Sequence, residues 1–386
     1  MRAAVLALVC AAAGAAAALG LGRATGLVGT GRSETVVARE PAPVVSTPAA
    51  VRAGATGFSP ARIYARRAAG VVTVFSTFGG TASQGSGFVV DADGTILTNA
   101  HVITTAGESS GPVERATAVS VEFRDHDRIP ATIVGWDVYD DVGVLRVAPA
   151  AHPLEPLPLG RSSPVVVGEP VAAIGSPLGN ADSLAVGIVS ATRRSIAALT
   201  VPRFQLVDAI QTDATIAHGS SGGPLLDADG AVIGINAQIR SDQGSGAGVG
   251  FAVPIDAARR SLHELLTKGR VEYAYAGVQT EDVTPALAEH LRLPVRRGAL
   301  VDVVTPKGPA ARAGLRGGRH EQEFLGESVT TGGDIVVAVG RTPVASADDL
   351  VRIVTNSLRP GRTAAFRIVR GTRRLTVPIV LEPRTR

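Results

Sequence analysis

Short apolar runs separated by glycine-containing turns recur along residues 71–254, and they restrict this region to a fold built mainly from strands. Six such runs precede residue 150, and a second set follows up to residue 254. Glycine is abundant at 45 residues, as expected for many short strands joined by tight turns, and aromatic residues make up only 4% of the chain. A length of 386 residues leaves room for two or three domains. We therefore expect an all-β domain and at least one further domain.

A serine lies within a glycine-rich turn at residues 219–226 (Gly-Ser-Ser-Gly-Gly-Pro-Leu-Leu). A serine nucleophile must stand clear of its backbone, and it needs N–H groups directed at the oxyanion that forms when it attacks a carbonyl. Flanking glycines allow strained backbone angles and close approach of a substrate. The spacing makes Ser221 the candidate nucleophile and the amides of Gly219 and Ser221 the candidate oxyanion donors. A hairpin loop without chemistry has the same composition, so the turn alone leaves both alternatives open.

A histidine and an aspartate, each beside an apolar run, precede this serine. His101 follows the run 96–98, and Asp141 precedes the run 142–147. A serine hydroxyl needs a neutral imidazole to accept its proton, and a buried carboxylate fixes the imidazole tautomer and stabilises the imidazolium. Taken singly, such a histidine is more often structural and such an aspartate is more often a solvated turn residue. Together, in the order His, Asp, Ser, they predict a catalytic triad of His101, Asp141 and Ser221.

Three segments carry a family resemblance: residues 98–102 (Thr-Asn-Ala-His-Val), 141–145 (Asp-Val-Gly-Val-Leu) and 219–225 (Gly-Ser-Ser-Gly-Gly-Pro-Leu). They resemble the HtrA, or Deg, family of chymotrypsin-fold serine proteases, and the resemblance covers residues 60–384. It implies two antiparallel six-stranded β-barrels followed by a small α+β PDZ domain. Histidine and aspartate would come from the first barrel and serine from the second. The family usually has Asn-Pro-Gly-Asn before the nucleophile, whereas this chain has Ala-His-Gly-Ser at 217–220.

The resemblance also implies which residues line the pocket for the substrate residue before the cleaved bond. The three stretches that it assigns to this pocket, 215–217, 236–238 and 250–252, contain no acidic residue. A buried acid would be needed to pair with an arginine or lysine side chain of the substrate. We therefore expect cleavage after small or medium aliphatic residues. Asp213, the nearest acid, is expected to bond within its own loop. The expected pocket residues are Thr215, Ile216, Ala217, Asn236, Ala237, Gln238, Gly250, Phe251 and Ala252.

Residues 273–384 resemble the PDZ domain that follows the protease domain in this family. A PDZ domain adds a peptide strand to an exposed sheet edge and binds the peptide's C-terminal carboxylate with loop amides. By the resemblance, residues 347–354 form the helix beside this groove, and the carboxylate loop is Tyr275, Ala276, Gly277 and Val278. A purely structural domain that binds nothing is the alternative. Residues 318–331 interrupt the Gly-Leu-x-x-Gly-Asp sequence that is usual in this domain, and they are expected to form an exposed polar insert.

The N-terminal region divides into an apolar segment and a linker. Residues 1–22 have one early positive charge and an Ala/Leu/Val run, typical of a cleaved signal peptide or of a single-span membrane anchor. Residues 23–57 are rich in Ala, Pro, Gly, Ser and Thr and predict a flexible linker. A trypsin-like protease domain is expected over 58–270. Either fate of the first segment places the protein outside the cytoplasm, anchored by residues 3–22 or released.

Composition excludes several classes of function. The only cysteine is Cys10, so we expect no disulfide in the folded part, as suits a bacterial periplasmic, cell-envelope or secreted protein. The net charge of +4 is spread along the chain without a basic block, which argues against nucleic acid as a partner. No Walker-type glycine loop is present, so ATP hydrolysis is not expected. We expect no cofactor and no metal.

These observations predict an ATP-independent serine endopeptidase of extracytoplasmic protein quality control. Its partners would be unfolded or damaged proteins and peptides with free apolar C-termini at the PDZ domain. The resemblance also implies a homotrimer, since members of the family usually form trimers, with Phe58 and Tyr64 at the contact. Membrane association would follow if residues 3–22 are retained. The alternative is a chaperone or peptide-sensing scaffold with little proteolysis.

Overall fold

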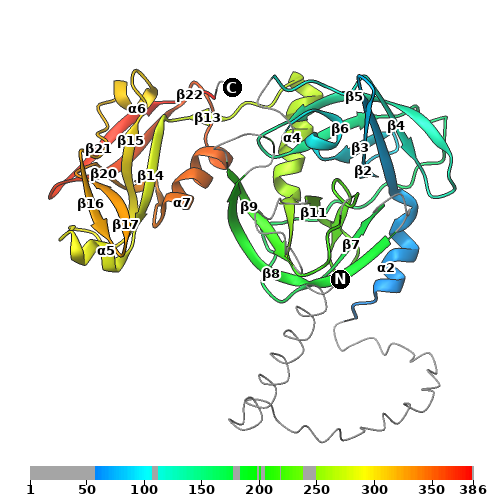
Figure 1. The fold of residues 1–386 in the computed structure, drawn as a ribbon, viewed down its shortest axis with the longest axis horizontal. Helices are drawn as coiled ribbons and strands as arrows, with labels where there is room; N and C mark the ends of the chain where they lie inside the picture. Colours follow the sequence, from blue (N-terminus) through cyan, green and yellow to red (C-terminus); the bar gives the residue numbers. More distant parts are fainter. Residues whose placement is uncertain are drawn as a thin grey trace, which may run out of the picture. The chain divides into compact units, whose positions relative to one another are not determined.

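Two closed six-stranded antiparallel barrels form the first part of the chain (Figure 1). This computed structural model describes residues 57–106, 112–176, 183–197, 200, 205–217, 219–237 and 249–384. The first barrel contains β1 (Val71–Phe78), β2 (Thr81–Val89), β3 (Thr95–Thr98), β4 (Ala118–Glu122), β5 (Arg128–Asp137) and β6 (Val142–Arg146). The second contains β7 (Pro170–Gly175), β8 (Ser183–Ala197), β9 (Gln205–Thr212), β10 (Pro224–Leu226), β11 (Val232–Ala237) and β12 (Gly250–Pro254). The predicted pair of barrels is confirmed.

Alternation along the strands explains how the barrels are filled and how they meet. In β1, Val72 and Val74 belong to the first barrel's own core, whereas Val71 packs in a cluster shared with the second barrel. In β7, Ala172 and Ile174 join that shared cluster. Successive strand residues point to opposite faces, so each strand can contribute to both cores. The shared apolar layer fixes the loops at the junction of the barrels.

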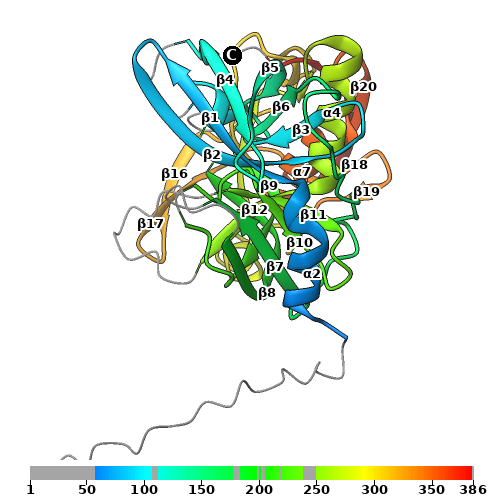
Figure 2. The same cartoon turned by 90° about the vertical axis from the view of Figure 1, so that its right-hand side faces the viewer.

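Short helices cover the ends of the barrels. The helix α2 (Pro60–Arg67) and the 3₁₀ turn η1 (Ala68–Gly70) precede β1, and Figures 1 and 2 show α2 beside β7. The four-residue α3 (Ala100–Ile103) follows β3. The longer α4 (Ile255–Lys268) follows β12 and buries Ala258 and Leu265 against the shared cluster. Phe58 and Tyr64, expected at a trimer contact, pack against the same cluster.

The C-terminal part contains a strand-rich domain with its own core. Its main sheet has the order β14-β15-β18-β20-β21, and β19 pairs with β18. Its helices are α5 (Pro285–His290), α6 (Pro309–Arg312), α7 (Ala347–Arg352) and the π-helical turn η3 (Ile353–Ser357). The main-sheet strands are β14 (Val278–Val283), β15 (Gly298–Val304), β18 (Ile335–Val339), β19 (Thr342–Pro343), β20 (Thr363–Arg370) and β21 (Arg373–Val380). The short strands β13 (Ala274–Tyr275) and β22 (Glu382–Pro383) pair with each other.

The insert at 318–331 is exposed over most of its length, as expected of a polar insert, and it has regular structure. It forms a hairpin of β16 (His320–Phe324) and β17 (Glu327–Thr331). Val329 is buried in an apolar cluster with Leu300, and Phe324 packs against that cluster. The first four residues of β16 and the first two of β17 are exposed, whereas Val329 and Thr331, alternate residues of β17, are buried.

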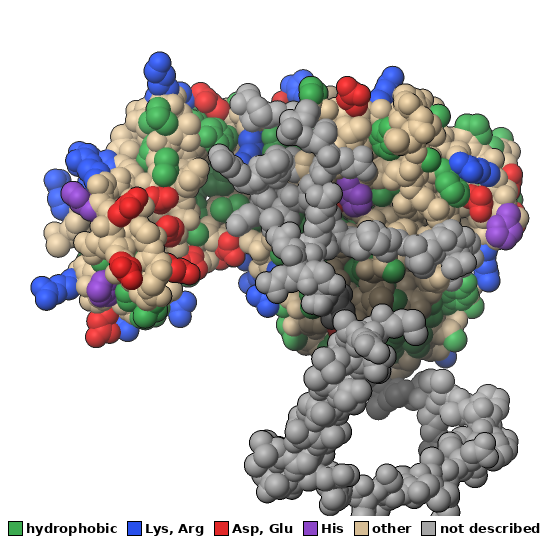
Figure 3. Space-filling view, viewed as in Figure 1, with side chains coloured by type: hydrophobic (Ala, Val, Ile, Leu, Met, Phe, Trp, Pro, Cys, Tyr) green, Lys and Arg blue, Asp and Glu red, His purple; other side chains and the backbone are tan. Residues whose placement is uncertain are grey.

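Charged side chains of both signs occur over both domains on the face shown in Figure 3. Within the described ranges, no helix has the length and apolar character needed to cross a bilayer. The expected signal or anchor at 1–22 and nearly all of the linker lie outside those ranges.

Candidate active site

The histidine and aspartate of the predicted triad are in direct contact. His101 lies in α3, and Asp141 lies in the turn before β6. Asp141 Oδ2 is 2.8 Å from His101 Nδ1, and Asp141 Oδ1 accepts a 3.0 Å hydrogen bond from the His101 backbone N–H. The Asn99 side chain donates to the Asp141 carbonyl at 2.8 Å. With the Asp141 side chain only 7% exposed, this geometry suits a carboxylate that orients an imidazole.

Glycines shape the turn that carries Ser221. Gly219 and Gly222 have φ angles of +93° and +89°, in the region that only glycine enters without a Cβ penalty. A Cβ on Gly222 would lie 2.1 Å from the Ser86 carbonyl oxygen. The Ser221 carbonyl accepts a 2.7 Å hydrogen bond from the Ser86 N–H. The glycines are therefore required both by backbone angle and by the close approach of β2.

Gly85 marks the place where the histidine helix and the serine turn meet. A Cβ on Gly85 would lie 2.7 Å from Val102 Cγ2 and 3.1 Å from the Ser221 carbonyl oxygen. Because Val102 follows His101 in α3, the histidine and serine segments border the same narrow space. The structure thus brings the segments of all three predicted triad residues together.

Ser86 is a site residue that the sequence analysis missed. It is fully buried, and its hydroxyl donates to the Gly219 carbonyl at 2.6 Å and accepts from the Ser176 N–H at 2.9 Å. It therefore ties the first barrel to the serine turn and to the end of β7. Residues 85–90 have the pattern of an ordinary strand, so no local signal distinguishes this serine.

Two buried aspartates before Asp141 were also missed. Asp137 accepts hydrogen bonds from the Tyr273 hydroxyl at 2.5 Å and the Ser261 hydroxyl at 2.7 Å. Burial, and secondly the nearby charge of Asp140, raise the pKa of Asp137 to about 6. Asp140 is 1% exposed and pairs with Arg260. Three aspartates within five residues are the only trace of this cluster in the sequence.

The residues expected in the substrate pocket lie on adjoining segments of the second barrel. Asn236 and Ala237 pair with Ala252 and Phe251 across β11 and β12. A Cβ on Gly250 would lie 2.7 Å from Ile216 Cδ1, so the segment 215–217 approaches β12 closely. Exposure is high for Thr215 and partial for Ala217. His218 and Gln238 lie outside the described residues.

Asp213 was expected to bond within its own loop, but its side-chain hydrogen bond reaches the neighbouring strand β8. Its Oδ1 accepts a 2.6 Å hydrogen bond from the Ile188 N–H. This carboxylate oxygen is therefore occupied by the backbone of β8.

The loop predicted to bind a peptide carboxylate turns tightly between β13 and β14. Gly277 has a φ of +77° and its carbonyl accepts from the Thr305 N–H at 2.9 Å. The Tyr275 hydroxyl lies 2.9 Å from Thr305 Oγ1, and the Ala276 carbonyl accepts from the Ala310 N–H at 2.9 Å. Val278 then begins β14, which stands at the end of the main sheet order. The loop is thus held beside an edge strand.

Comparison with protein families matches two domains. Residues 85–235 match the trypsin-like peptidase domain, and residues 274–381 match the PDZ domain. Among solved structures, an HtrA-type protease, AlgW with tripeptide, is 31% identical, with a TM-score of 0.70 over 85% of this chain and 98% of its own. The serine endoprotease from Yersinia pestis is 28% identical, with a TM-score of 0.61 over the same 85% of this chain and 98% of its own.

Curated relatives show the same similarity. The putative serine protease HhoA of Synechocystis is 38% identical over 77% of this chain and 70% of its own length. Protease Do-like 1, chloroplastic, of Arabidopsis thaliana is 36% identical over 78% of this chain and 64% of its own. A probable periplasmic serine endoprotease DegP-like of Pseudomonas fulva is 37% identical over 78% of this chain and 56% of its own. The chain thus spans between 56% and 70% of the length of these relatives.

Proposed function

Because this chain belongs to the HtrA family of serine proteases, we propose that it is an ATP-independent serine endopeptidase acting through Ser221, His101 and Asp141. The observation that carries the proposal is the Asp141 carboxylate. It contacts both the ring Nδ1 and the backbone N–H of His101, beside the glycine turn of Ser221.

In the proposed mechanism, Ser221 Oγ attacks the substrate carbonyl carbon while His101 Nε2 takes the hydroxyl proton. Asp141 keeps the other ring nitrogen protonated and stabilises the imidazolium. The amides of Gly219 and Ser221 donate to the oxyanion of the tetrahedral intermediate. His101 then protonates the leaving amine, and water hydrolyses the acyl-enzyme by the same route in reverse.

We propose cleavage after small or medium aliphatic residues. The stretches 215–217, 236–238 and 250–252 offer no carboxylate to a basic side chain, and Asp213 is engaged by the Ile188 N–H. A buried lysine or arginine without a partner would be strongly disfavoured. Peptides with Val, Ala or Leu immediately before the cleaved bond should therefore be cleaved faster than peptides with Arg or Lys at that position. Comparable cleavage rates would contradict this proposal.

A second proposal concerns the PDZ domain: it binds the free C-terminus of an apolar peptide along β14. Among the described strands, β14 pairs on one side only, with β15, and the loop 275–278 lies at its start. Such an edge supports addition of a peptide strand. Binding of a peptide with an apolar free carboxylate, and at least about tenfold weaker binding of its amidated form, would support it. Equal binding would contradict it.

The proposed setting is protein quality control outside the cytoplasm, with unfolded or damaged proteins as substrates and PDZ ligands as regulators. The name of the Pseudomonas fulva relative, a periplasmic endoprotease, supports the location. A homotrimer is part of the proposal, and sedimentation of the purified chain tests it. Residues 1–22 would direct the chain there, either cleaved or retained as an anchor.

The test of the enzyme is degradation of unfolded casein by the chain and by Ser221→Ala, with and without a PDZ peptide. Mass spectrometry of the products reads the residue before each cut. Loss of cleavage in Ser221→Ala supports the protease. Unfolded casein that is bound but never cut would instead favour the chaperone or scaffold.

A further inference from the structure

The turn that carries Asp141 requires support from outside itself. Asp141 has a φ of +51°, a left-handed conformation that is uncommon for residues other than glycine. The turn joins β5 to β6 and is buried, with Asp137 at 3%, Asp140 at 1% and Asp141 at 5% exposure. Three aspartates in so dry a place need cations or hydrogen-bond donors nearby.

Arg260 of α4 supplies the cation. Its Nη2 lies 2.5 Å from Asp140 Oδ2, and its side chain is only 14% exposed. Asp140 is the immediate neighbour of Asp141, so the position of one carboxylate restrains the backbone of the other. A buried ion pair whose partner is removed leaves an uncompensated charge, which is strongly unfavourable.

Two residues close to Arg260 in the chain also bind the turn 137–141, through Asp137. Ser261 and Tyr273, on either side of the end of α4, both donate to Asp137 Oδ2. Asp137 Oδ1 in turn accepts from the backbone N–H groups of Tyr139 at 3.0 Å and Asp140 at 3.4 Å. The charged and titratable groups that surround Asp140 are therefore Asp137, Arg260, Tyr273 and, more distantly, Asp208.

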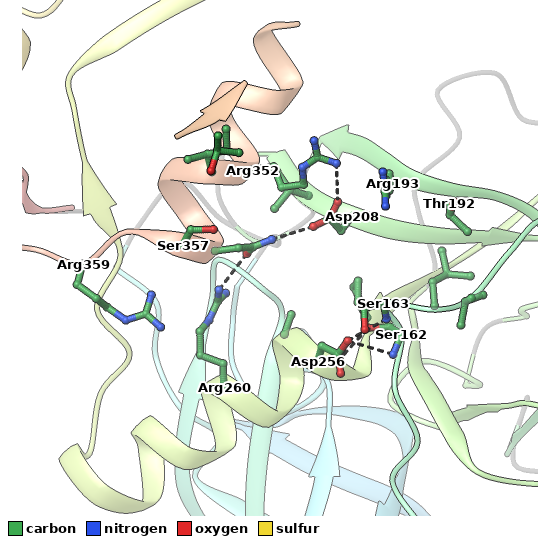
Figure 4. A pocket seen from close by; sticks show the side chains of 18 residues that line it. Ser162, Ser163, Thr192, Arg193, Asp208, Asp256, Arg260, Arg352, Ser357 and Arg359 are labelled. Carbon is green, nitrogen blue, oxygen red and sulfur yellow. Dashed lines mark hydrogen bonds and ion pairs between the residues drawn. The ribbon is translucent and has the colours of Figure 1, made fainter. Parts of the chain in front are cut away.

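The second terminal nitrogen of Arg260 is held from the other direction. Its Nη1 donates to Asn356 Oδ1 at 2.9 Å and to the Thr355 carbonyl at 3.4 Å, both in η3. Asn356 donates to Asp208 of β9 at 2.8 Å. Figure 4 shows Arg260 rising from α4 toward Asp208 at the wall of a cavity of about 680 Å³. Contacts at both ends therefore leave the guanidinium little freedom to move.

We propose that Arg260 is a positioning residue of the active site, which holds Asp141 against His101 by clamping Asp140. The proposal rests on the proposed protease function. Arg260 touches neither substrate nor reacting atoms and acts through the backbone of the turn 137–141. A displaced Asp141 would stabilise the imidazolium of His101 less and would select its tautomer less strictly.

The kinetic test compares Arg260→Gln with the matched control Arg259→Gln. Arg259 is exposed on the same helix and donates to the Leu159 carbonyl, away from the turn. We expect Arg260→Gln to lower kcat about tenfold to a hundredfold with KM changed less than about twofold, since small misplacements of catalytic groups cost this much. The apparent pKa of the base in the pH profile of kcat/KM should also fall. Arg259→Gln should change neither.

Two further variants separate positioning from loss of folding. Arg260→Lys keeps the charge without the forked geometry and should recover part of kcat and of the pH profile. Asp140→Asn should resemble Arg260→Gln, and the double variant should lose less than the product of the two single losses. A folded Arg260→Gln with wild-type kcat and pH profile would overturn the proposal. The proposal would also be overturned if the loss of kcat in Arg260→Lys simply followed its loss of thermal stability.

A spectroscopic measurement keeps this test separate from the protease proposal. The His101 Nδ1 proton, shared with Asp141, should give a far-downfield NMR signal in the wild-type protein. Weakening or an upfield shift of this signal in Arg260→Gln, and not in Arg259→Gln, supports positioning even if no substrate is cut. An unchanged signal in Arg260→Gln would overturn it.

Discussion

The serine turn and the aspartate turn both contribute to the proposed active site, but different chemistry holds each in shape. The turn at 219–223 depends on glycines with positive φ and on backbone hydrogen bonds with Ser86 of β2 and Asn236 of β11. The turn at 137–141 depends on buried carboxylates paired with Arg260, Ser261 and Tyr273. Steric requirements therefore dominate in the first turn and electrostatic ones in the second, so substitutions and pH should affect the two turns differently.

The largest effect is expected from Ser221→Ala. Removal of the nucleophile should lower kcat by at least about 10⁴-fold. The hydrogen bond to Ser86 uses the backbone, so the free energy of unfolding should change little. Casein degradation and urea unfolding measure the two quantities. Residual cleavage near the wild-type rate would show that another group is the nucleophile.

Gly222→Ala tests the steric character of the serine turn. The new Cβ would lie 2.1 Å from the Ser86 carbonyl and the φ is +89°, so we expect a loss of about 3 kcal/mol or more of stability together with activity. The matched control is Gly168→Ala, where φ is +93° but no atom lies within 4 Å. It should lose only about 1–2 kcal/mol. If urea unfolding shows equal losses of stability in the two variants, the positive φ alone explains why glycine is required at position 222.

Asp137→Asn tests the electrostatic character of the aspartate turn. The pKa of Asp137 is raised from 3.8 to about 6 in the folded state, so the folded protein holds this proton more tightly than the unfolded chain. Its contribution to stability is therefore present below pH 3.8 and is lost as pH rises through about 6. The free energy of unfolding of the wild type should fall relative to Asp137→Asn over this range by on the order of 3 kcal/mol. A pH-independent difference would contradict this.

The smallest effect is expected from Ser86→Ala, which removes the hydroxyl linking the two barrels at the serine turn. Its two hydrogen bonds, to Gly219 and from Ser176, suggest a loss of about 1–2 kcal/mol. The rate should fall about tenfold, since the turn loses one restraint. Ser83→Ala on the same strand is the control for thermal unfolding and kcat/KM, and an equal response in both variants would remove Ser86 from the site.

The sequence allowed one of these turns to be predicted better than the other, for a physical reason. Glycines at 219, 222 and 223 are local requirements of a tight turn, so the motif is visible in a few residues. The barrels were predictable because apolar runs of strand length recur along the chain. In contrast, Arg260 lies 120 positions from Asp140, and only the packing of α4 against the first barrel brings them together. The same holds for Ser86, which reaches Gly219 across 133 positions.

The insert at 318–331 is a second region whose structure could not be predicted fully from the sequence. Its polar composition predicted an exposed insert, and most of it is exposed, but the hairpin and the burial of Val329 and Thr331 were not predicted. A period-2 pattern of only two apolar or small residues is too short to separate a hairpin from a loop.

The central claim is that Ser221 is a nucleophile activated by His101 and Asp141. A fluorophosphonate probe that reacts with activated serines tests it most directly, in the presence of saturating peptide with an apolar free carboxylate. Peptide mass spectrometry should find the label on Ser221 in the wild-type chain and lose it in His101→Ala. Labelling of another serine, or equal labelling of Ser221 without His101, would contradict the account.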